Sequence, residues 1–438
     1  MRKKSEYPGS FRDFVIDLAK TVSPKKGHGP LADIILRECQ RILSKEIAAP
    51  TLEKQLLMSP IISYADHHSF LNYKLLYNTN LLYTEVIKAL QLPYVIVFAT
   101  GSIPLANKSH PRGFYFNRTR YNFFLNKHKN IPVYLLEEKI NAARAGGIES
   151  LVLNYDKSLL TSEEIRFLDF LFFECLDIEK ASKDYDTFSD QITFLNHKLW
   201  KYYFNGNLRD SIPNLIYLQS NRLIREFLTR EIENTGSLIA LLLFEPKVRR
   251  IFLENFNGIA CCWGENMGSH LFWGVTEKKH MFPLKLDESS NSLVAEGFKI
   301  KLEKDAVIEA LNSQKILPTS FFDLLLVTFL EGYLTLGGFN QLEYLPQMQQ
   351  AHIKSLEEIG MTKMAEKFAA RVTDGLICGM FPFDFDSGID LIWHYNSRDG
   401  KFNGNLDHGL TQEDLNGMLD MKVKDMILSA IELMLENM

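Results

Sequence analysis

The apolar run at residues 94–99, YVIVFA, constrains the fold of this chain more than any other segment. It ends at Thr100-Gly101-Ser102, a combination typical of a strand that passes into a loop. A shorter apolar run at 61–64 precedes it, and the segment 71–90 between the two runs has a helical pattern. Strand, helix and strand at this spacing favour an α/β layer. We expect another strand at 131–136, followed by a helix over 137–146.

Most of the remaining chain has helical patterns. Thr161 with Glu164 has the spacing of a capping box, and Ser220 stands where a helix would be capped. From residue 269 the pattern changes to a β-hairpin and then to a half-buried strand near 298–302. The sequence thus predicts a helix-rich α/β or α+β fold, with a small N-terminal mixed or parallel sheet and a separate hairpin and strand region near 269–302.

Length favours more than one domain. We expect an α/β domain over 1–156 that carries the candidate site. A mainly helical domain would follow over 157–438, with a small β region at 258–302.

Composition limits the classes of partner. Hydrophobic residues make up 46% of the 438 residues, enough for a sizeable core, and the net charge of −5 gives no basic footprint for nucleic acid. The most hydrophobic stretch, 321–339, is interrupted by Asp323 and Glu331, so we expect a buried helix and no membrane partner. The cysteines at 39, 175, 261, 262 and 378 form no disulfide framework, and we expect reduced thiols and a cytoplasmic location.

Asp66, His67 and His68 follow the first apolar run. A carboxylate and two imidazoles after a strand can bind a metal ion or act as a general acid–base pair. The tripeptide resembles the signature of the DHH phosphoesterases, a resemblance that implies a manganese pair. Those enzymes also use an aspartate-rich motif upstream, and residues 1–63 contain none, so the family is not assigned. The alternative is that Asp66 caps a helix.

A second carboxylate group, Asp384 and Asp386, lies near the end of the chain. Alternating aspartates suit hard cations. The segment 384–388 resembles the D-x-D-G loop of haloacid-dehalogenase-type phosphatases, which place this loop at the start of an α/β domain. A turn rich in Asp, Ser and Gly is the alternative. We predict a divalent manganese, zinc or iron ion, held by Asp66, His67, His68, Asp384 and Asp386.

The loop after residue 99 is the predicted substrate-binding segment. Gly101 and Ser102 free backbone N–H groups and a hydroxyl at the carboxyl edge of a sheet, where open α/β sheets bind ligands. Arg112 can pair with a carboxylate or phosphate through two hydrogen bonds. The alternative is a tight connection stiffened by Pro104 and Pro111.

Glu331 is a further catalytic candidate, because it interrupts an apolar helical run where burial would raise the pKa of its carboxyl group. Asn340 and Gln341 follow a Gly-Gly turn and are candidates for binding a polar small molecule. The alternative is that Glu331 reaches solvent along the edge of the helix.

These residues predict an enzyme that acts on a small polar or anionic metabolite through hydrolysis or group transfer, with metal assistance as one option. In that reading Asp66, His67, His68 and Glu331 are catalytic, and His67 or His68 faces a common pocket with the 101–112 loop. The alternative function is a non-catalytic helical binding or interaction protein, of regulatory or effector type. It is favoured by the large aromatic-rich helical portion, in which no nucleotide-binding or zinc-protease motif is complete.

Overall fold

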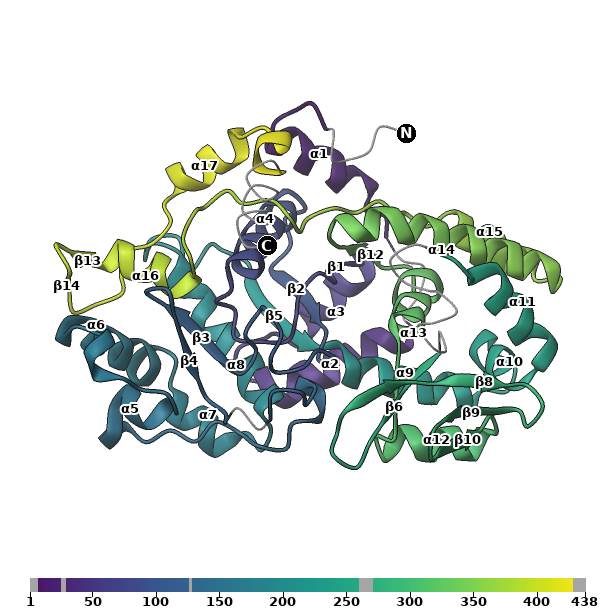
Figure 1. Cartoon of the computed structure of the whole chain (residues 1–438). Helices are drawn as coiled ribbons and strands as arrows, with labels where there is room; N and C mark the ends of the chain where they lie inside the picture. Colours follow the sequence, from purple (N-terminus) through teal and green to yellow (C-terminus); the bar gives the residue numbers. More distant parts are fainter. Residues whose placement is uncertain (1–6, 25–28, 126–127, 260–270, 428–438) are drawn as a thin grey trace.

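A four-stranded parallel sheet lies at the centre of the computed structural model, which describes residues 7–24, 29–125, 128–259 and 271–427 (Figure 1). Its strand order is β12-β1-β2-β5. The bounds of the strands are Leu334–Leu336 for β12, Ile61–Ser63 for β1, Tyr94–Ala99 for β2 and Asn214–Gln219 for β5. The predicted neighbouring strands at 61–64 and 94–99 are confirmed, and so is a helix-rich fold of α/β or α+β type.

The strongest pairing in this sheet joins β2 to β5, since every residue of β2 has a partner in β5. By contrast, β1 pairs with β2 only at Ser63 and Val97, and an isolated parallel bridge between His67 and Thr100 extends this contact beyond the strand end. All six residues of β2 are buried. Strands buried on both faces read as continuous apolar runs, which explains the sequence YVIVFA.

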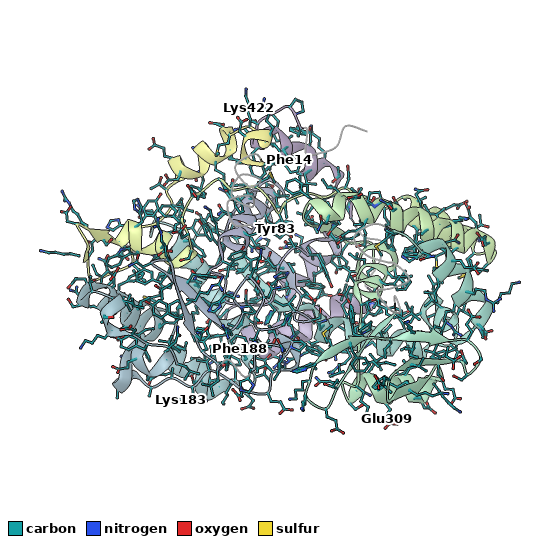
Figure 2. All side chains as sticks on the ribbon, in the orientation of Figure 1. Phe14, Tyr83, Lys183, Phe188, Glu309 and Lys422 are labelled. Carbon is teal, nitrogen blue, oxygen red and sulfur yellow. The ribbon has the colours of Figure 1, made fainter. Side chains whose placement is uncertain are left out.

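Helices surround the sheet. The predicted capping box at Thr161–Glu164 is present, and Thr411 and Asp414 form another. Figure 2 shows Phe14, Tyr83 and Phe188 inside the molecule and Lys183, Glu309 and Lys422 at its periphery. The α-helices are α1 (Phe11–Thr21), α2 (Pro30–Leu43), α3 (Ala49–Met58), α4 (Lys74–Ala89), α5 (Gly147–Leu151), α6 (Ser162–Asp169), α7 (Ile178–Asp184), α8 (Phe188–Trp200), α9 (Ser220–Glu233), α10 (Leu238–Phe244), α11 (Pro246–Phe256), α12 (Lys304–Asn312), α13 (Ser320–Leu324), α14 (Phe339–Glu358), α15 (Thr362–Ala369), α16 (Gly388–Asn396) and α17 (Gln412–Asp420).

Short antiparallel sheets make up the rest of the β structure. The predicted region near 269–302 forms two of them, and the predicted hairpin is β6 with β7. The loop that follows β2 carries another hairpin, β3 with β4. The strand bounds are β3 (Gly113–Phe116), β4 (Thr119–Asn122), β6 (Phe272–Val275), β7 (Met281–Pro283), β8 (Lys285–Asp287), β9 (Ser292–Ala295), β10 (Phe298–Lys301), β11 (Ile316–Pro318), β13 (Ser397–Arg398) and β14 (Lys401–Phe402).

The prediction of a strand at 131–136 is wrong. This segment contains a 3-10 turn, η3 (Val133–Leu135), and its backbone bonds to the loop after β2: Val133 N donates to Ile103 O and Tyr134 N donates to Gly101 O. The helix expected over 137–146 is also absent. There the amide side chain of Gln191 holds Ile140, accepting from its N at 2.7 Å and donating to its O at 2.9 Å.

The buried helix expected over 321–339 is shorter than predicted. It consists of α13 and a π-helical turn, η9 (Leu325–Leu330), and it stops at Gly332, whose φ of +82° only glycine adopts without strain. Strand β12 follows at once. Among the residues that the structure describes, no helix combines the length and apolar composition that crossing a membrane requires.

Helix α8 covers the outer edge of β5. Three side chains of α8 contact the carbonyl oxygens of alternate residues. Thr193 Oγ1 lies 2.8 Å from Tyr217 O, His197 Nδ1 lies 2.7 Å from Leu215 O, and Trp200 Nε1 lies 3.0 Å from Pro213 O. These backbone groups would otherwise form the free edge of the sheet. Since β5 and β12 lie after residue 156, the sheet draws on both sides of the predicted domain boundary, which stays a prediction.

Candidate functional site

Polar side chains follow β1, β2 and β5 at the carboxyl edge of the sheet. Because these strands are parallel neighbours, their ends meet on one side of the molecule. The backbone ties the ends together: Thr100 N donates to Asp66 O and His68 N donates to Thr100 O, each at 2.8 Å. The backbone therefore brings the 66–68 and 100–102 segments together, whereas the predicted common pocket of His67 or His68 with the 101–112 loop stays a prediction.

His67 is the half-buried member of the tripeptide. Its Nδ1 lies 3.1 Å from the hydroxyl of Ser109, which belongs to the loop after β2. Burial lowers the pKa of His67, opposed by a hydrogen bond with Asn107. An imidazole that is neutral near pH 7 and touches a hydroxyl is suited to accept and return a proton.

Asp66 points elsewhere and is almost fully buried. Its Oδ2 accepts a hydrogen bond of 2.7 Å from Asn80 Nδ2. Burial raises the pKa of Asp66 to about 7, against the lowering effect of hydrogen bonds with Asn80 and Tyr217. The carboxyl group is therefore held near its midpoint of ionisation at neutral pH.

His68 is completely buried and lies on a third side. Its Nε2 is 3.0 Å from Ser189 Oγ and 3.1 Å from Ser189 O, and its ring stacks on Tyr217 with 5.7 Å between the ring centroids. Burial lowers the pKa of His68 to about 4, so the ring is neutral at physiological pH. This is the environment of a structural histidine that supports the end of β5.

A cavity of 250 Å³ lies at the end of β5, where α9 begins; we call it the α9 cavity. Gln219 is the lining residue that most strongly indicates a ligand. Its side chain is 5% exposed, and neither Oε1 nor Nε2 has a hydrogen-bond partner in the part of the chain that the structure describes. A buried amide without partners costs stability. The lining residues are Tyr134, Leu135, Leu136, Glu137, Thr187, Ser189, Gln219, Arg222, Arg225 and Gln314.

The N-terminus of α9 lies beside this cavity, since Gln219 lines it and precedes the helix. Gln219 is the N-cap but makes no side-chain cap, and Ser220, the predicted cap, is instead the first helical residue. Unsatisfied N–H groups and the helix dipole favour an anion at such a terminus.

Two arginines line the α9 cavity in different states. Arg222 is neutralised, because its Nη1 bonds to Glu38 at 3.0 Å and to Asp190 at 2.9 Å. Arg225 forms no ion pair with the described residues, and its guanidinium lies 5.9 Å from the ring centroid of Tyr134. Arg225 is thus the cation available to a ligand.

The loop after β2 joins this cavity to the tripeptide. Gly101 N donates to Asn221 Oδ1 at 2.7 Å, and a side chain at position 101 would collide with Gln219. Glycine at 101 therefore gives the Gln219 amide its room. Ser102 Oγ lies 3.0 Å from Thr100 Oγ1. Arg112 lies near His110. Burial lowers the pKa of His110, and the positive charge of Arg112 lowers it further.

The aspartates predicted as metal ligands near the end of the chain are held in ion pairs. Asp384 pairs with Lys74, and Asp386 pairs with Arg118 at 3.2 Å. No group of three or more His, Cys, Asp or Glu side chains within the described ranges is placed to hold a metal ion. The five residues predicted as metal ligands are not brought together, so the metal ion stays a prediction without a ligand cluster among these residues.

Three further predicted residues surround β12. Glu331 lines a cavity at the opposite, amino edge of the sheet. Asn340 is exposed, and the Gln341 side chain turns back to donate from Nε2 to Thr335 O at 2.9 Å. Gln341 thus contributes to the fold beside β12.

The sequence analysis missed Gln219 and Arg225. A signal was present: the apolar run at 215–218 passes into Gln-Ser-Asn, as the run at 94–99 passes into Thr-Gly-Ser. Comparison with known proteins identifies no further site residue, because neither a family model nor a curated protein matches this chain.

Proposed function

We propose that this chain is an enzyme that binds a small anionic metabolite in the α9 cavity and acts on it by acid–base chemistry from His67. The observation that carries the proposal is Gln219, a buried and unpartnered amide in a cavity at a helix N-terminus. A ligand with oxygen atoms at this position would satisfy the amide, the first-turn N–H groups and Arg225 together.

His67 is the favoured reacting group because it combines partial exposure, a lowered pKa and a hydroxyl neighbour. Two strand spacings separate β1 from β5, a distance of about 10 Å. A metabolite that places its anionic group at α9 can therefore present its reacting atom near His67. In this proposal Ser109 positions the imidazole, and no step requires a metal ion.

The same cavity supports a second candidate, a protein that binds the metabolite without converting it. Gln219 favours binding in either case, whereas His67 has a role only in conversion. The two functions differ in whether a bound metabolite is consumed.

The experiment combines binding and turnover on a mixture of small carboxylates and phosphate esters. A metabolite that binds should raise the melting temperature of the protein, and the affinity derived from this shift should be at least tenfold weaker in Gln219→Leu and in Arg225→Gln. The control is Arg250→Gln, which alters an exposed ion pair and should bind as tightly as the wild type. Mass spectrometry should show consumption of that metabolite by the wild-type protein. His67→Gln should bind it normally but convert it about 100-fold more slowly, with exposed His280→Gln as the control.

Binding that is unaffected by both cavity substitutions would contradict the α9 cavity as the site. Normal binding without consumption in the wild type would favour the binding protein. Consumption that survives His67→Gln would remove His67 from the mechanism.

A further inference from the structure

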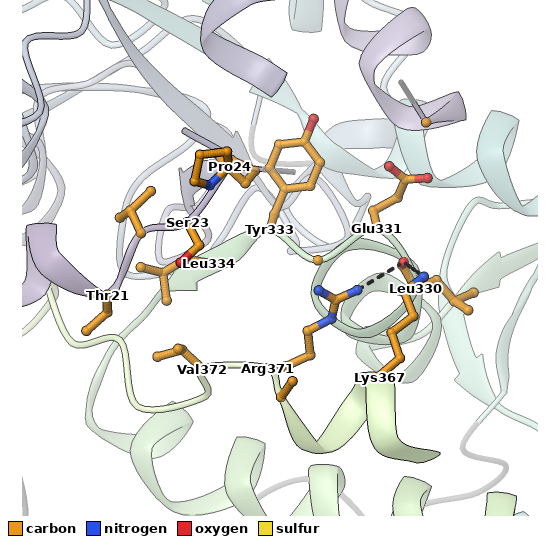
Figure 3. Close-up of a pocket in the computed structure, with 15 residues that line it drawn as sticks. Thr21, Ser23, Pro24, Leu330, Glu331, Tyr333, Leu334, Lys367, Arg371 and Val372 are labelled. Atoms are coloured by element: carbon orange, nitrogen blue, oxygen red, sulfur yellow. Dashed lines mark hydrogen bonds between the residues drawn. The ribbon is translucent and has the colours of Figure 1, made fainter. Parts of the chain in front are cut away.

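A larger cavity, of 720 Å³, lies at the opposite edge of the parallel sheet; we call it the amino-edge cavity (Figure 3). It sits where β1 and β12 begin, since Pro60 and Leu334 both line it and Leu334 N donates to Pro60 O at 2.8 Å. The proposed reaction makes no use of this cavity, which is separated from the α9 cavity by the length of the strands.

Two basic side chains line the amino-edge cavity, Lys367 from the last turn of α15 and Arg371 from the segment just after it. Lys367 Nζ donates to Leu330 O at 2.8 Å, and Arg371 Nε donates to Phe329 O at 3.2 Å. These carbonyls end the π-helical turn η9, where the helix dipole is negative. The carbonyls hold both side chains in place but carry only partial charges.

The charges of Lys367 and Arg371 are not neutralised by any carboxylate within the described ranges. Burial lowers the pKa of both groups, and the charge of Arg371 lowers the pKa of Lys367 further. Glu331 also lines the cavity, but Figure 3 shows its carboxylate directed away from the two cations, against Gly29. An anion between Lys367 and Arg371 would relieve their mutual repulsion.

The backbone makes room for this arrangement at Gly332. Its φ of +82° disfavours other residues, and a side chain there would collide with the guanidinium of Arg371. Glycine at 332 thus leaves room for the guanidinium, whose Nη1 makes no hydrogen bond to the described residues. A planar guanidinium with free donors is suited to bind two oxygens of one phosphate.

We propose that Lys367 and Arg371 form a binding site for the phosphate group of a small phosphate monoester. Two cations at one point favour a doubly charged group over a single carboxylate. The volume exceeds the need of a bare ion, and Val22, Pro24, Tyr333 and Val372 supply an apolar wall for the organic part. The site is independent of the function proposed for the α9 cavity.

The test is a titration of the full chain with phenyl phosphate and with inorganic phosphate at constant ionic strength, by calorimetry and by hydrogen–deuterium exchange. We expect phenyl phosphate to bind more tightly than inorganic phosphate, since only the ester contacts the apolar wall. It should protect the peptides that cover 329–334 and 367–372. Lys367→Met and Arg371→Gln should each weaken this binding at least tenfold.

The control is Lys363→Met, which removes an exposed lysine one turn earlier on α15 that does not line the cavity, and its affinity should equal that of the wild type. Arg371 also bonds to carbonyls, so Arg371→Gln can fail to fold. In that case the affinity of Lys367→Met for phenyl phosphate tests the proposal, because the side chain of Lys367 is more exposed. Equal affinity in the wild type and Lys367→Met would overturn the proposal. Protection confined to the peptides around 219–225 would also overturn it, and would place the phosphate in the α9 cavity instead.

Discussion

Two buried carboxyl groups, those of Asp66 and Asp323, have strongly raised pKa values. Asp66 bonds to Asn80, and Asp323 Oδ2 accepts from the hydroxyl of Tyr64 at 2.7 Å. Burial raises the pKa of each carboxyl group to about 7. Folding therefore favours their protonated forms, whereas the unfolded chain ionises them near pH 4.

The sign of the resulting pH dependence follows from proton binding. Between pH 4 and 7 the carboxyl group of Asp66 is protonated in the folded state and ionised in the unfolded state. The contribution of Asp66 to the free energy of unfolding therefore falls as the pH rises through this range. Asp66→Asn removes the titration and keeps the shape. We expect the free energy of unfolding of Asp66→Asn, relative to wild type, to rise by about 1 kcal/mol per pH unit between pH 5 and 7 in urea titrations.

Asp190→Asn provides a comparison of opposite sign. Burial raises the pKa of Asp190, but hydrogen bonds and charges from Arg41 and Arg222 outweigh it and lower the pKa overall. The stabilisation by Asp190 is present above pH 4 and is lost in more acidic solution.

If the difference in unfolding free energy between Asp66→Asn and the wild type does not change with pH, the prediction for Asp66 is wrong. The carboxyl group of Asp66 would then titrate normally in the folded protein.

At this scale the sequence predicted the position of the tripeptide but not its geometry. Asp66, His67 and His68 were expected to act together, yet they contact Asn80, Ser109 and Ser189 respectively. Backbone hydrogen bonds to Thr100 hold this segment against the end of β2. Each of the three side chains then packs against a different neighbour, so they do not converge on one ligand.

At the scale of elements, the contact between α8 and β5 gives a direct test of how the edge of the sheet is closed. Thr193→Val removes a donor to the buried carbonyl of Tyr217 in β5, and Trp200→Phe removes a donor to the buried carbonyl of Pro213, the residue before β5. An unpaired buried carbonyl costs about 1–3 kcal/mol, so each variant should lose that much unfolding free energy in urea. Thr229→Val is the matched control, because its hydroxyl bonds only within α9 and the loss should stay within about 0.5 kcal/mol.

Strand and helix positions were predicted where local pattern decides them. The run at 94–99 is a strand because an apolar segment of that length must be buried on both faces. The run at 131–136 has a similar composition, but its backbone is bound by the loop after β2, and that tertiary contact leaves no trace in the local sequence. The same holds for 137–146, which the Gln191 side chain holds from another helix.

At the scale of the molecule, the sheet is assembled from strands that lie far apart in the sequence. Strand β2 pairs along its whole length with β5, beyond residue 156, while its backbone pairing with β1 is limited to Ser63 with Val97 and to the bridge between His67 and Thr100. We expect a fragment of residues 1–156 to show no cooperative unfolding by circular dichroism. Co-expression with a fragment of residues 157–438 should restore it, because that fragment supplies β5 and β12.

Cooperative unfolding of the 1–156 fragment alone would contradict this prediction and would establish the predicted domain boundary. Local patterns cannot decide the matter in advance, since pairing between β1 and β12 joins residues more than 270 positions apart, such as Ile61 with Leu334. Long-range pairing of this kind has no local signature.

Both flanks of the central sheet are closed. Side chains of α8 cover β5, and on the other side Gly337 N donates to Gly375 O while Ile377 N donates to Gly337 O, both at 2.9 Å. A run such as YVIVFA has the composition of segments that stack into fibrils when another chain can add to them. Within the described part of the molecule, this run is enclosed between β1 and β5, so aggregation through it requires a state in which one of these two strands has separated from β2.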